Sequence, residues 1–253
     1  MILVPDLPVP SRLIWRDSLD STNDEARRLI LSGAAADLLV VVAGQQTAGR
    51  GRRGRTWVSP PGNLHVSVLL SIDGRLAQAA QLGFVAAVAL VDAFSRLLPA
   101  ARFRAKWPND VVVETPAGWR KCAGMLLEPV GSGWLVLGIG VDVAAAPSPH
   151  GLNHPAVALA DLGFGGQPMS VLEQMMAAFV PLAQQWRRQG FGPARQLWLD
   201  RCRGLGEPAV VRLEAETLTG TFTGLDDEGA LLLDQPGQGM RRILAGDVFF
   251  PPV

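Results

Sequence analysis

A nine-residue run of the chain combines glycine with clustered guanidinium groups and ends in an aromatic residue: Gly49-Arg50-Gly51-Arg52-Arg53-Gly54-Arg55-Thr56-Trp57. Glycine lets a backbone approach a ligand closely, and arginine presents forked donors that match carboxylate and phosphate. The run formally contains G-x-G-x-x-G, but Pro60, Pro61 and Gly62 exclude the helix that a dinucleotide-binding turn requires next. The run indicates an anion-binding loop, although by itself a solvated charged loop or a nucleic-acid contact is equally favoured.

A second run, Lys106-Trp107-Pro108-Asn109-Asp110, lies between two strand-like segments. Proline fixes the turn, so that Asn109 and Asp110 are held at the entrance of the following strand. In isolation such a run is more often a simple Asx turn. Lys121 follows eleven residues later, in Arg120-Lys121-Cys122-Ala123-Gly124, where small neighbours allow a ligand to approach. A lone lysine before a strand is usually solvated, so each of these signals is weak alone.

The composition excludes several classes of protein. With 253 residues, 48% hydrophobic and 18% charged, the chain can bury a large core and is not a disordered protein. Lysine plus arginine equals aspartate plus glutamate, at 23 each. This balance argues against a protein that coats nucleic acid or an anionic membrane through its net charge.

Residues that bind metals are few and badly placed for it. Cys122 and Cys202 lie far apart in no paired motif, which favours a reduced, cytoplasmic protein without a disulfide framework or a cysteine zinc site. His150 and His154 are four residues apart, but Pro149, Gly151 and Pro155 prevent a shared helix face. We therefore expect a loop there and no metal site formed by the protein alone.

No segment is expected to target or cross a membrane. Residues 1–10 hold no basic leader, which argues against a signal peptide. The longest apolar stretch, residues 82–98, is interrupted by Asp92 and Arg96. It therefore predicts a buried helix and not a membrane span.

The hydrophobic pattern predicts an α+β main domain over residues 1–204, in which a mixed sheet packs against helices. Thr22 and Glu25 match a capping box that would start a helix over 25–32. Further helices are expected over 76–98, 171–189 and 193–203, and strands over 38–43, 64–70, 103–107, 111–114, 119–128 and 134–143. Residues 205–253 show short strands separated by glycine turns, at 209–214, 217–223, 230–234, 240–244 and 247–250, which suits a small barrel.

Taken together and in order, these runs resemble the catalytic domain of biotin–protein ligases. The resemblance is carried by Ser21-Thr22-Asn23, the segment from Gln46 to Arg55, the K-W-P-N-D run, the R-K-x-A-G run and Gly138-Ile139-Gly140. The segments Gly224-Leu225-Asp226, 229–232 and 245–248 resemble the SH3-like barrel of the same family. The resemblance covers roughly residues 13–250. It implies the sheet of class II aminoacyl-tRNA synthetases and biotin ligases, followed by that barrel.

The resemblance implies a two-step reaction with biotin, ATP and Mg²⁺. The biotin carboxylate would attack the α-phosphate of MgATP to give biotinyl-5′-AMP, and a lysine of a biotin carboxyl carrier protein would then take the biotin. Cationic donors that neutralise both anions suit this chemistry, and a metal ion would shield the departing pyrophosphate.

The resemblance also implies a role for each matched residue. Lys121, Arg52 and Asp110 would be catalytic, with Lys121 bridging the carboxylate and the α-phosphate and Asp110 as general base for the incoming lysine. The implied biotin-binding residues are Ser21, Thr22, Asn23, Gln46, Arg50, Gly51, Arg52, Lys121 and Gly124. The implied ATP-binding residues are Arg55, Trp57, Lys106, Asn109, Asp110, Gly138, Gly140 and Asp142.

One position departs from the family pattern. Asp142 stands after G-I-G-x, where the family usually has asparagine. Asparagine both donates to and accepts from adenine, whereas an ionised aspartate only accepts. Adenine can still donate its exocyclic amine, so the departure is compatible with ATP.

Two other functions compete with this interpretation. A lipoate–protein ligase shares the fold and the adenylate chemistry, but the arginine loop and the K-W-P-N-D run favour biotin. A DNA-binding repressor would need a helix-turn-helix domain, and only about twenty residues precede Ser21. We therefore expect a ligase that does not bind DNA or membranes, and the sequence leaves open a homodimer formed through an edge strand.

The arginine loop gives a first prediction. Residues 48–56 are rich in glycine and carry four clustered cations that repel one another, so they should be more mobile than the flanking strands without ligand. Biotin plus ATP should order them and raise their protection in amide hydrogen exchange. Equal protection with and without these ligands would contradict the prediction.

Overall fold

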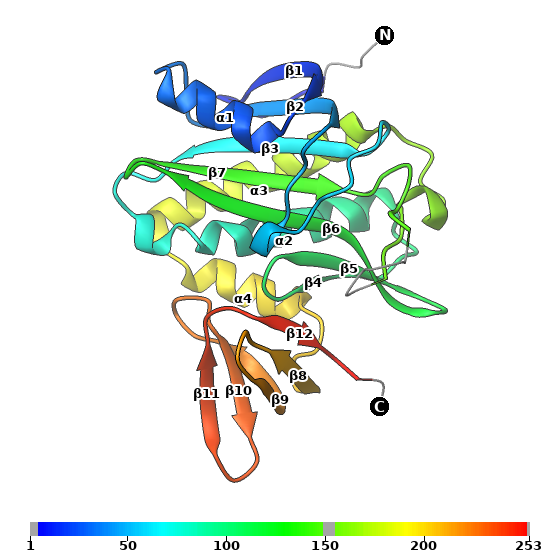
Figure 1. The fold of residues 1–253 in the computed structure, drawn as a ribbon, viewed down its shortest axis with the longest axis vertical. Helices are drawn as coiled ribbons and strands as arrows, with labels where there is room; N and C mark the ends of the chain where they lie inside the picture. Colours follow the sequence, from blue (N-terminus) through cyan, green and yellow to red (C-terminus); the bar gives the residue numbers. More distant parts are fainter. Residues whose placement is uncertain (1–4, 149–154, 252–253) are drawn as a thin grey trace.

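The computed structural model describes residues 5–148 and 155–251, so His150 and His154 lie outside the described residues. Its larger sheet has the strand order β1-β2-β3-β7-β6-β5-β4 (Figure 1). β1 and β2 run parallel, and every other neighbouring pair in this sheet runs antiparallel. The strands are β1 (Arg12–Leu19), β2 (Leu39–Gln46), β3 (Leu64–Ser71), β4 (Phe103–Lys106), β5 (Asp110–Thr115), β6 (Gly118–Val130) and β7 (Trp134–Val141).

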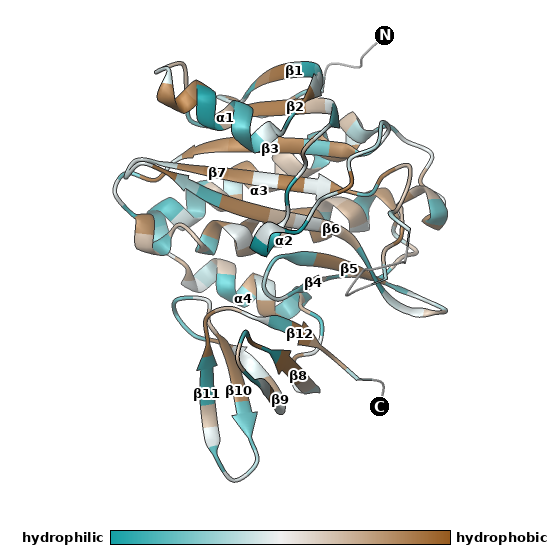
Figure 2. Cartoon of the chain, in the orientation of Figure 1, coloured by the Kyte–Doolittle hydropathy of each residue, from teal (hydrophilic) through white to brown (hydrophobic). Residues whose placement is uncertain are grey.

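Four helices pack on the two faces of this sheet, and the last of them, α4, connects it to the second sheet. They are α1 (Thr22–Leu31), α2 (Gln81–Leu97), α3 (Pro168–Gln189) and α4 (Gly192–Arg201). Along β2, Val40 and Val42 belong to the main core with α2 and α3, whereas Leu39 and Val41 belong to a smaller core with α1. The central strands are apolar along most of their length, as the hydropathy colours show (Figure 2), because both of their faces are covered.

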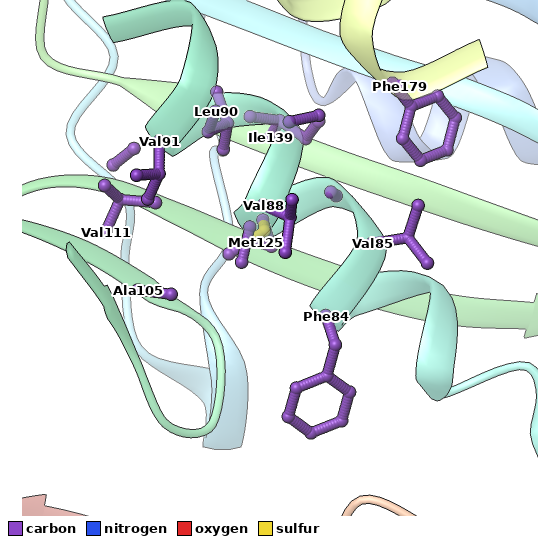
Figure 3. Packing of buried hydrophobic residues seen from close by; sticks show 14 of the residues in the cluster. Phe84, Val85, Val88, Leu90, Val91, Ala105, Val111, Met125, Ile139 and Phe179 are labelled. Carbon is purple, nitrogen blue, oxygen red and sulfur yellow. The ribbon is translucent and has the colours of Figure 1, made fainter. Parts of the chain in front are cut away.

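The alanine-rich helix α2 forms the centre of the main core. Val85, Val88 and Val91 on this helix pack with residues of the strands behind it, including Met125 of β6 and Ile139 of β7 (Figure 3). The small alanine side chains let α2 lie close to the sheet, and α3 and α4 cover its other sides. The opposite face of the same strands is thereby left to α1 and to the loop that follows β2.

A second, antiparallel sheet follows α4, with the strand order β11-β10-β9-β8-β12. Its strands are β8 (Pro208–Arg212), β9 (Thr217–Leu225), β10 (Leu231–Gln235), β11 (Gly239–Ile243) and β12 (Asp247–Phe249). Trp198 of α4 packs edge-on against Phe222 of this sheet, with ring centroids 6.5 Å apart. Trp107 Nε1 donates to the carbonyl of Gly229 at 3.2 Å. Aromatic packing and this hydrogen bond fix the second sheet against the first.

The structure confirms the predicted fold class, a mixed sheet with packed helices followed by an SH3-like antiparallel unit. The strand β1 was not predicted, because its exposed residues break the apolar alternation. The expected helix over 76–98 is a short 3₁₀ turn, Leu76–Gln78, followed by α2. The exact boundary at 204/205 stays a prediction. None of the helices in the described part of the chain is long and apolar enough to cross a membrane.

The predicted capping box at the start of α1 is wrong. The helix begins at Thr22 with Ser21 as the N-cap residue, and no side chain makes a capping hydrogen bond. The Thr22 hydroxyl instead donates to Gln46 Oε1 at 3.1 Å, while Glu25 pairs with Arg16 and Arg28. Tertiary partners therefore replace the local cap, and they orient the first turn of α1 towards the sheet.

Candidate active site

A cavity of about 480 Å³ lies on the face of the larger sheet that carries α1. The segment after β2 runs across this face in front of β7 and β6 (Figure 1). Every site residue predicted from the sequence lines this cavity: Ser21, Thr22, Asn23, Gln46, Arg50, Gly51, Arg52, Arg55, Trp57, Lys106, Asn109, Asp110, Lys121, Gly124, Gly138, Gly140 and Asp142. The fold therefore brings together runs that lie far apart in the sequence.

Main chain forms the floor of the cavity. Gly124 of β6 lies opposite Gly140 of β7, and Gly138 lies two residues earlier in β7. A Cβ atom on Gly138 would stand 2.3 Å from Asn23 Oδ1, and one on Gly140 would stand 2.4 Å from Trp57 Cε2. Only glycine therefore leaves room for the Asn23 amide and the Trp57 ring to lie on the sheet.

Neutral polar side chains line the end of the cavity under α1, and Arg50 near them is paired with Asp24 and Glu128. Thr22 N donates to Gln46 Oε1 at 2.8 Å, and Gln46 Nε2 donates to Ser59 Oγ at 2.9 Å. Ser67 Oγ lies 2.5 Å from Asn23 Oδ1. These amides and hydroxyls are oriented by their neighbours, so this end suits a neutral group that both donates and accepts hydrogen bonds.

The arginine run forms a small hairpin over the cavity. Gly51 N donates to the Arg55 carbonyl at 2.7 Å, and Trp57 N donates to the Gly49 carbonyl at 2.9 Å. Arg53 and Gly54 form the turn with positive φ angles of 54° and 70°. The hairpin thus has internal hydrogen bonds, while its predicted mobility without ligand stays a prediction.

Two arginines of the hairpin have partners on α1, on β6 and in the turn between β4 and β5. Arg50 Nη2 lies 2.9 Å from Asp24 Oδ1 of α1 and 3.4 Å from Glu128 Oε2 of β6. Arg52 Nη1 donates to Asn109 Oδ1 at 3.1 Å, and burial together with the nearby Arg53 lowers the pKa of Arg52. The hairpin therefore presents Arg52 towards the cavity.

A cluster of charges forms the other end of the cavity. Lys121 Nζ lies 2.6 Å from Asp110 Oδ1 and 5.3 Å from the centroid of the Trp57 ring. Lys106 lies opposite Asp110 in the register of β4 and β5, and burial lowers the pKa of Lys106 although the charge of Asp110 opposes this. The carboxylate of Asp110 therefore compensates part of the positive charge when no ligand is bound. Both ammonium groups can interact with an anion that enters the cavity.

Asp142 is a buried carboxyl group in the same wall, only 2% exposed. Burial raises its pKa to about 7, and the charge of Lys121 opposes that rise. Asn63 Nδ2 donates to Asp142 Oδ1 at 3.4 Å. The side chain is therefore partly protonated near neutral pH and can then donate as well as accept, as an asparagine does.

Comparison with known proteins shows the family. Residues 15–142 match the model of the biotin/lipoate A/B protein ligase family, and residues 204–250 match the biotin protein ligase C-terminal domain. The biotin–[acetyl-CoA-carboxylase] ligase of Paracoccus denitrificans is 43% identical over 242 residues, which are 91% of this chain and 97% of that protein. The chain belongs to the biotin protein ligase family. The resemblance seen in the sequence is confirmed, and the chain is an enzyme of the ligase class.

Two further relatives place the ligase within its family. The bifunctional ligase/repressor BirA of Bacillus subtilis is 33% identical over 248 residues, which are 93% of this chain and 73% of that protein. The biotin protein ligase of Aquifex aeolicus in complex with biotin and ATP has a TM-score of 0.81 at 26% identity, covering 94% of this chain and 99% of that one.

Several residues of the ligase's cavity and its rim were not predicted from the sequence. Glu128 accepts from Asn23 Nδ2 at 2.6 Å and contacts Arg50. Strand alternation places Glu128 on the same face as Gly124, so period-two spacing could have found it. Asp247 lines the cavity from the second sheet and pairs with Arg55. No local pattern indicates Asp247, because only the packing of one sheet on the other brings it there.

The glycine floor gives a stability prediction. Gly138→Ala should destabilise the ligase by about 1–3 kcal/mol, because the new methyl group overlaps the Asn23 amide. Urea unfolding would measure this change. Gly133→Ala is the matched control in the turn before β7, because its Cβ would have no atom within 4 Å. Equal free energies of unfolding for both variants would contradict the prediction.

Asp142 gives a prediction about pH. Its pKa of about 7 in the folded protein lies above the unfolded value of 3.8, so the wild type loses stability as pH rises from about 4 to about 7. Asp142→Asn removes this loss. The variant should gain roughly 2–4 kcal/mol relative to the wild type by pH 8, and little at pH 4. Urea unfolding of both proteins between pH 4 and pH 8 measures this gain. A difference in free energy of unfolding that does not change with pH would refute the prediction.

Proposed function

We propose that the chain activates biotin with MgATP to biotinyl-5′-AMP and transfers biotin to one lysine of a biotin carboxyl carrier protein. The observation that carries this proposal is a single cavity with a neutral polar end under α1 and a cationic end at Lys121. The cationic residues that line it are Arg50, Arg52, Arg55, Lys106 and Lys121, against the carboxyl groups of Asp110, Asp142 and Asp247. Such an excess of positive charge suits a site where two anions must meet.

The ureido ring of biotin fits the neutral end. A urea carries two N–H donors and one carbonyl acceptor, and Ser21, Thr22 and Gln46 offer the matching hydroxyl and amide groups. Asn23, fixed by Ser67 and Glu128, borders the same space. The carboxylate of biotin then points along the glycine floor to Lys121 and Arg52.

The first step joins the carboxylate to the nucleotide. One carboxylate oxygen forms a bond to the α-phosphorus, and the bond from that phosphorus to the oxygen of pyrophosphate breaks. Lys121 would contact both anions, and Arg52 would stabilise the negative charge on the phosphoryl oxygens. Arg55, Trp57, Lys106, Asn109, Gly138, Gly140 and Asp142 would hold ATP, with Asp142 facing the base.

The second step transfers biotin to the carrier. The neutral amine of the carrier lysine attacks the carbonyl carbon of the adenylate, AMP leaves, and the amine gives up a proton. Asp110 is our candidate to accept this proton, because it lies at the start of β5 beside Lys121.

Magnesium would enter with ATP. Among residues 5–148 and 155–251, no group of three or more histidine, cysteine, aspartate or glutamate side chains could hold a metal ion. Magnesium often keeps several waters and binds through substrate phosphates and one or two carboxylates, and this cavity fits that mode. When bound, it would shield the charge of the pyrophosphate.

The setting and assembly are part of the same proposal. Cys122 and Cys202 are free and buried, which agrees with a reducing, cytoplasmic location. The strand β1 is an edge of the larger sheet and could pair with a second copy of the chain.

The overall reaction is tested by incubating the protein with MgATP, biotin and a biotin carboxyl carrier domain. Mass spectrometry should show one biotin added to one lysine of the carrier, with AMP and pyrophosphate released. A parallel reaction with lipoate, together with thermal-shift measurements for both acids, tests the lipoate alternative. If the protein modifies a lipoyl carrier in preference to the biotin carboxyl carrier domain, the proposal is wrong.

Lys121 gives the sharpest test of the mechanism. Lys121→Ala should slow biotinyl-adenylate formation by on the order of a hundredfold or more, because one preorganised charge donor is lost. Lys121→Arg should not fully restore the rate, since a planar fork does not replace a compact ammonium group. Single-turnover assays that start from biotin and ATP measure this step.

The matching assay starts from synthetic biotinyl-adenylate and measures transfer to the carrier. Lys121→Ala should slow this transfer less, because the phosphate already carries its charge in that ground state. Adenylate formation at the wild-type rate in the Ala variant would show that Lys121 has no part in the reaction.

A further inference from the structure

Asp247 connects the second sheet to the cavity. Among the described residues that line the cavity, it is the one that belongs to this sheet, where it opens β12 opposite Arg212 of β8. The sheet itself is fixed by the Trp107 hydrogen bond to Gly229 and by the contact of Trp198 with Phe222. Asp247 therefore has a defined position relative to the cavity.

Arg55 of the hairpin forms an ion pair with this carboxylate. Burial alone would raise the pKa of Asp247, but Arg55, Arg53 and Arg52 outweigh that effect and lower it. The side chain of Asp247 is 17% exposed and that of Arg55 is 46% exposed. An ion pair of this kind adds only about 0–1 kcal/mol to global stability, so its main effect is local.

Three arginines attach the hairpin to the rest of the molecule, and the middle one, Arg52, donates to Asn109. Arg50 is held by Asp24 and Glu128 on the larger sheet side, and Arg55 is held by Asp247 on the other. The backbone hydrogen bonds between Gly49 and Trp57 close the hairpin on itself but do not fix it in place. Loss of the Asp247 carboxylate would therefore free the Arg55 side chain and loosen the hairpin around it, while Arg52 keeps its hydrogen bond to Asn109.

We infer that Asp247 is a positioning residue for ATP binding, which holds Arg55 and with it the arginine hairpin in place over the cavity. A cationic loop that is already positioned loses less conformational freedom when a polyphosphate binds, so the nucleotide binds more tightly. The second sheet is then part of the active site, although it does not supply a catalytic residue. This inference rests on the proposed function and extends it.

Asp247→Asn tests the inference, because it keeps the size of the side chain and removes its charge. The KM for MgATP in adenylate formation should rise about three- to fivefold, while kcat and the KM for biotin change less than about twofold. Asp247→Glu should restore part of the affinity. Glu216→Gln is the matched control, because it removes the exposed ion pair with Arg241 on the same sheet without touching the cavity.

A double-mutant cycle shows whether Asp247 acts through Arg55. In an Arg55→Gln background, Asp247→Asn should change the KM for MgATP by less than about twofold. In the protein without ligands, Asp247→Asn should also speed amide exchange in residues 49–57 and leave the melting temperature nearly unchanged. Independent effects of the two substitutions, or unchanged exchange in the hairpin, would overturn the inference.

The two proposals fail in different ways. If the wild-type protein forms no biotinyl-adenylate, the proposed function is wrong. If the wild type is active and Asp247→Asn binds MgATP as the wild type does, only the role of Asp247 is wrong.

Discussion

Crowded positive charge is the constraint on which this structure depends. Five basic side chains line one cavity, and without partners their repulsion would oppose folding around it. Carboxylates from separate elements offset this: Asp110 pairs with Lys121, Asp24 with Arg50, and Asp247 with Arg55. These carboxylates come from the mixed sheet, from α1 and from the second sheet. The fold places each of them beside one basic side chain of the cavity.

The sequence was most informative where chemistry is local. The arginine hairpin, the K-W-P-N-D run and the R-K-x-A-G run each carry their functional side chains within a few residues, and all of them reach the cavity. The strands next to them could also be predicted, because a buried strand such as β2 is continuously apolar from Leu39 to Ala43. Only the family resemblance indicated that these separate runs form one site. Composition and spacing alone did not indicate this.

What the sequence could not predict depends on contacts between distant segments. The edge strand β1 has exposed residues and too little alternation to be recognised before its pairing with β2 is known. The capping box failed because Gln46, twenty-four residues away, binds the Thr22 hydroxyl. Asp247 entered the site only through the packing of two sheets. Tertiary partners, which local patterns do not contain, decided each of these cases.

The glycine floor also limits how this cavity can change. At Gly124, Gly138 and Gly140 the strands β6 and β7 have no side chains of their own, so Lys121, Asn23 and Trp57 lie directly on the backbone. Substitution there can add atoms but cannot remove any, so the pocket can be made shallower and never deeper. Acceptance of bulkier acids would therefore have to come from shortening other side chains that line the cavity, such as Trp57 and Leu126. In engineering terms, the backbone of β6 and β7 sets the greatest depth that the pocket can have, and only the side chains above it are open to redesign.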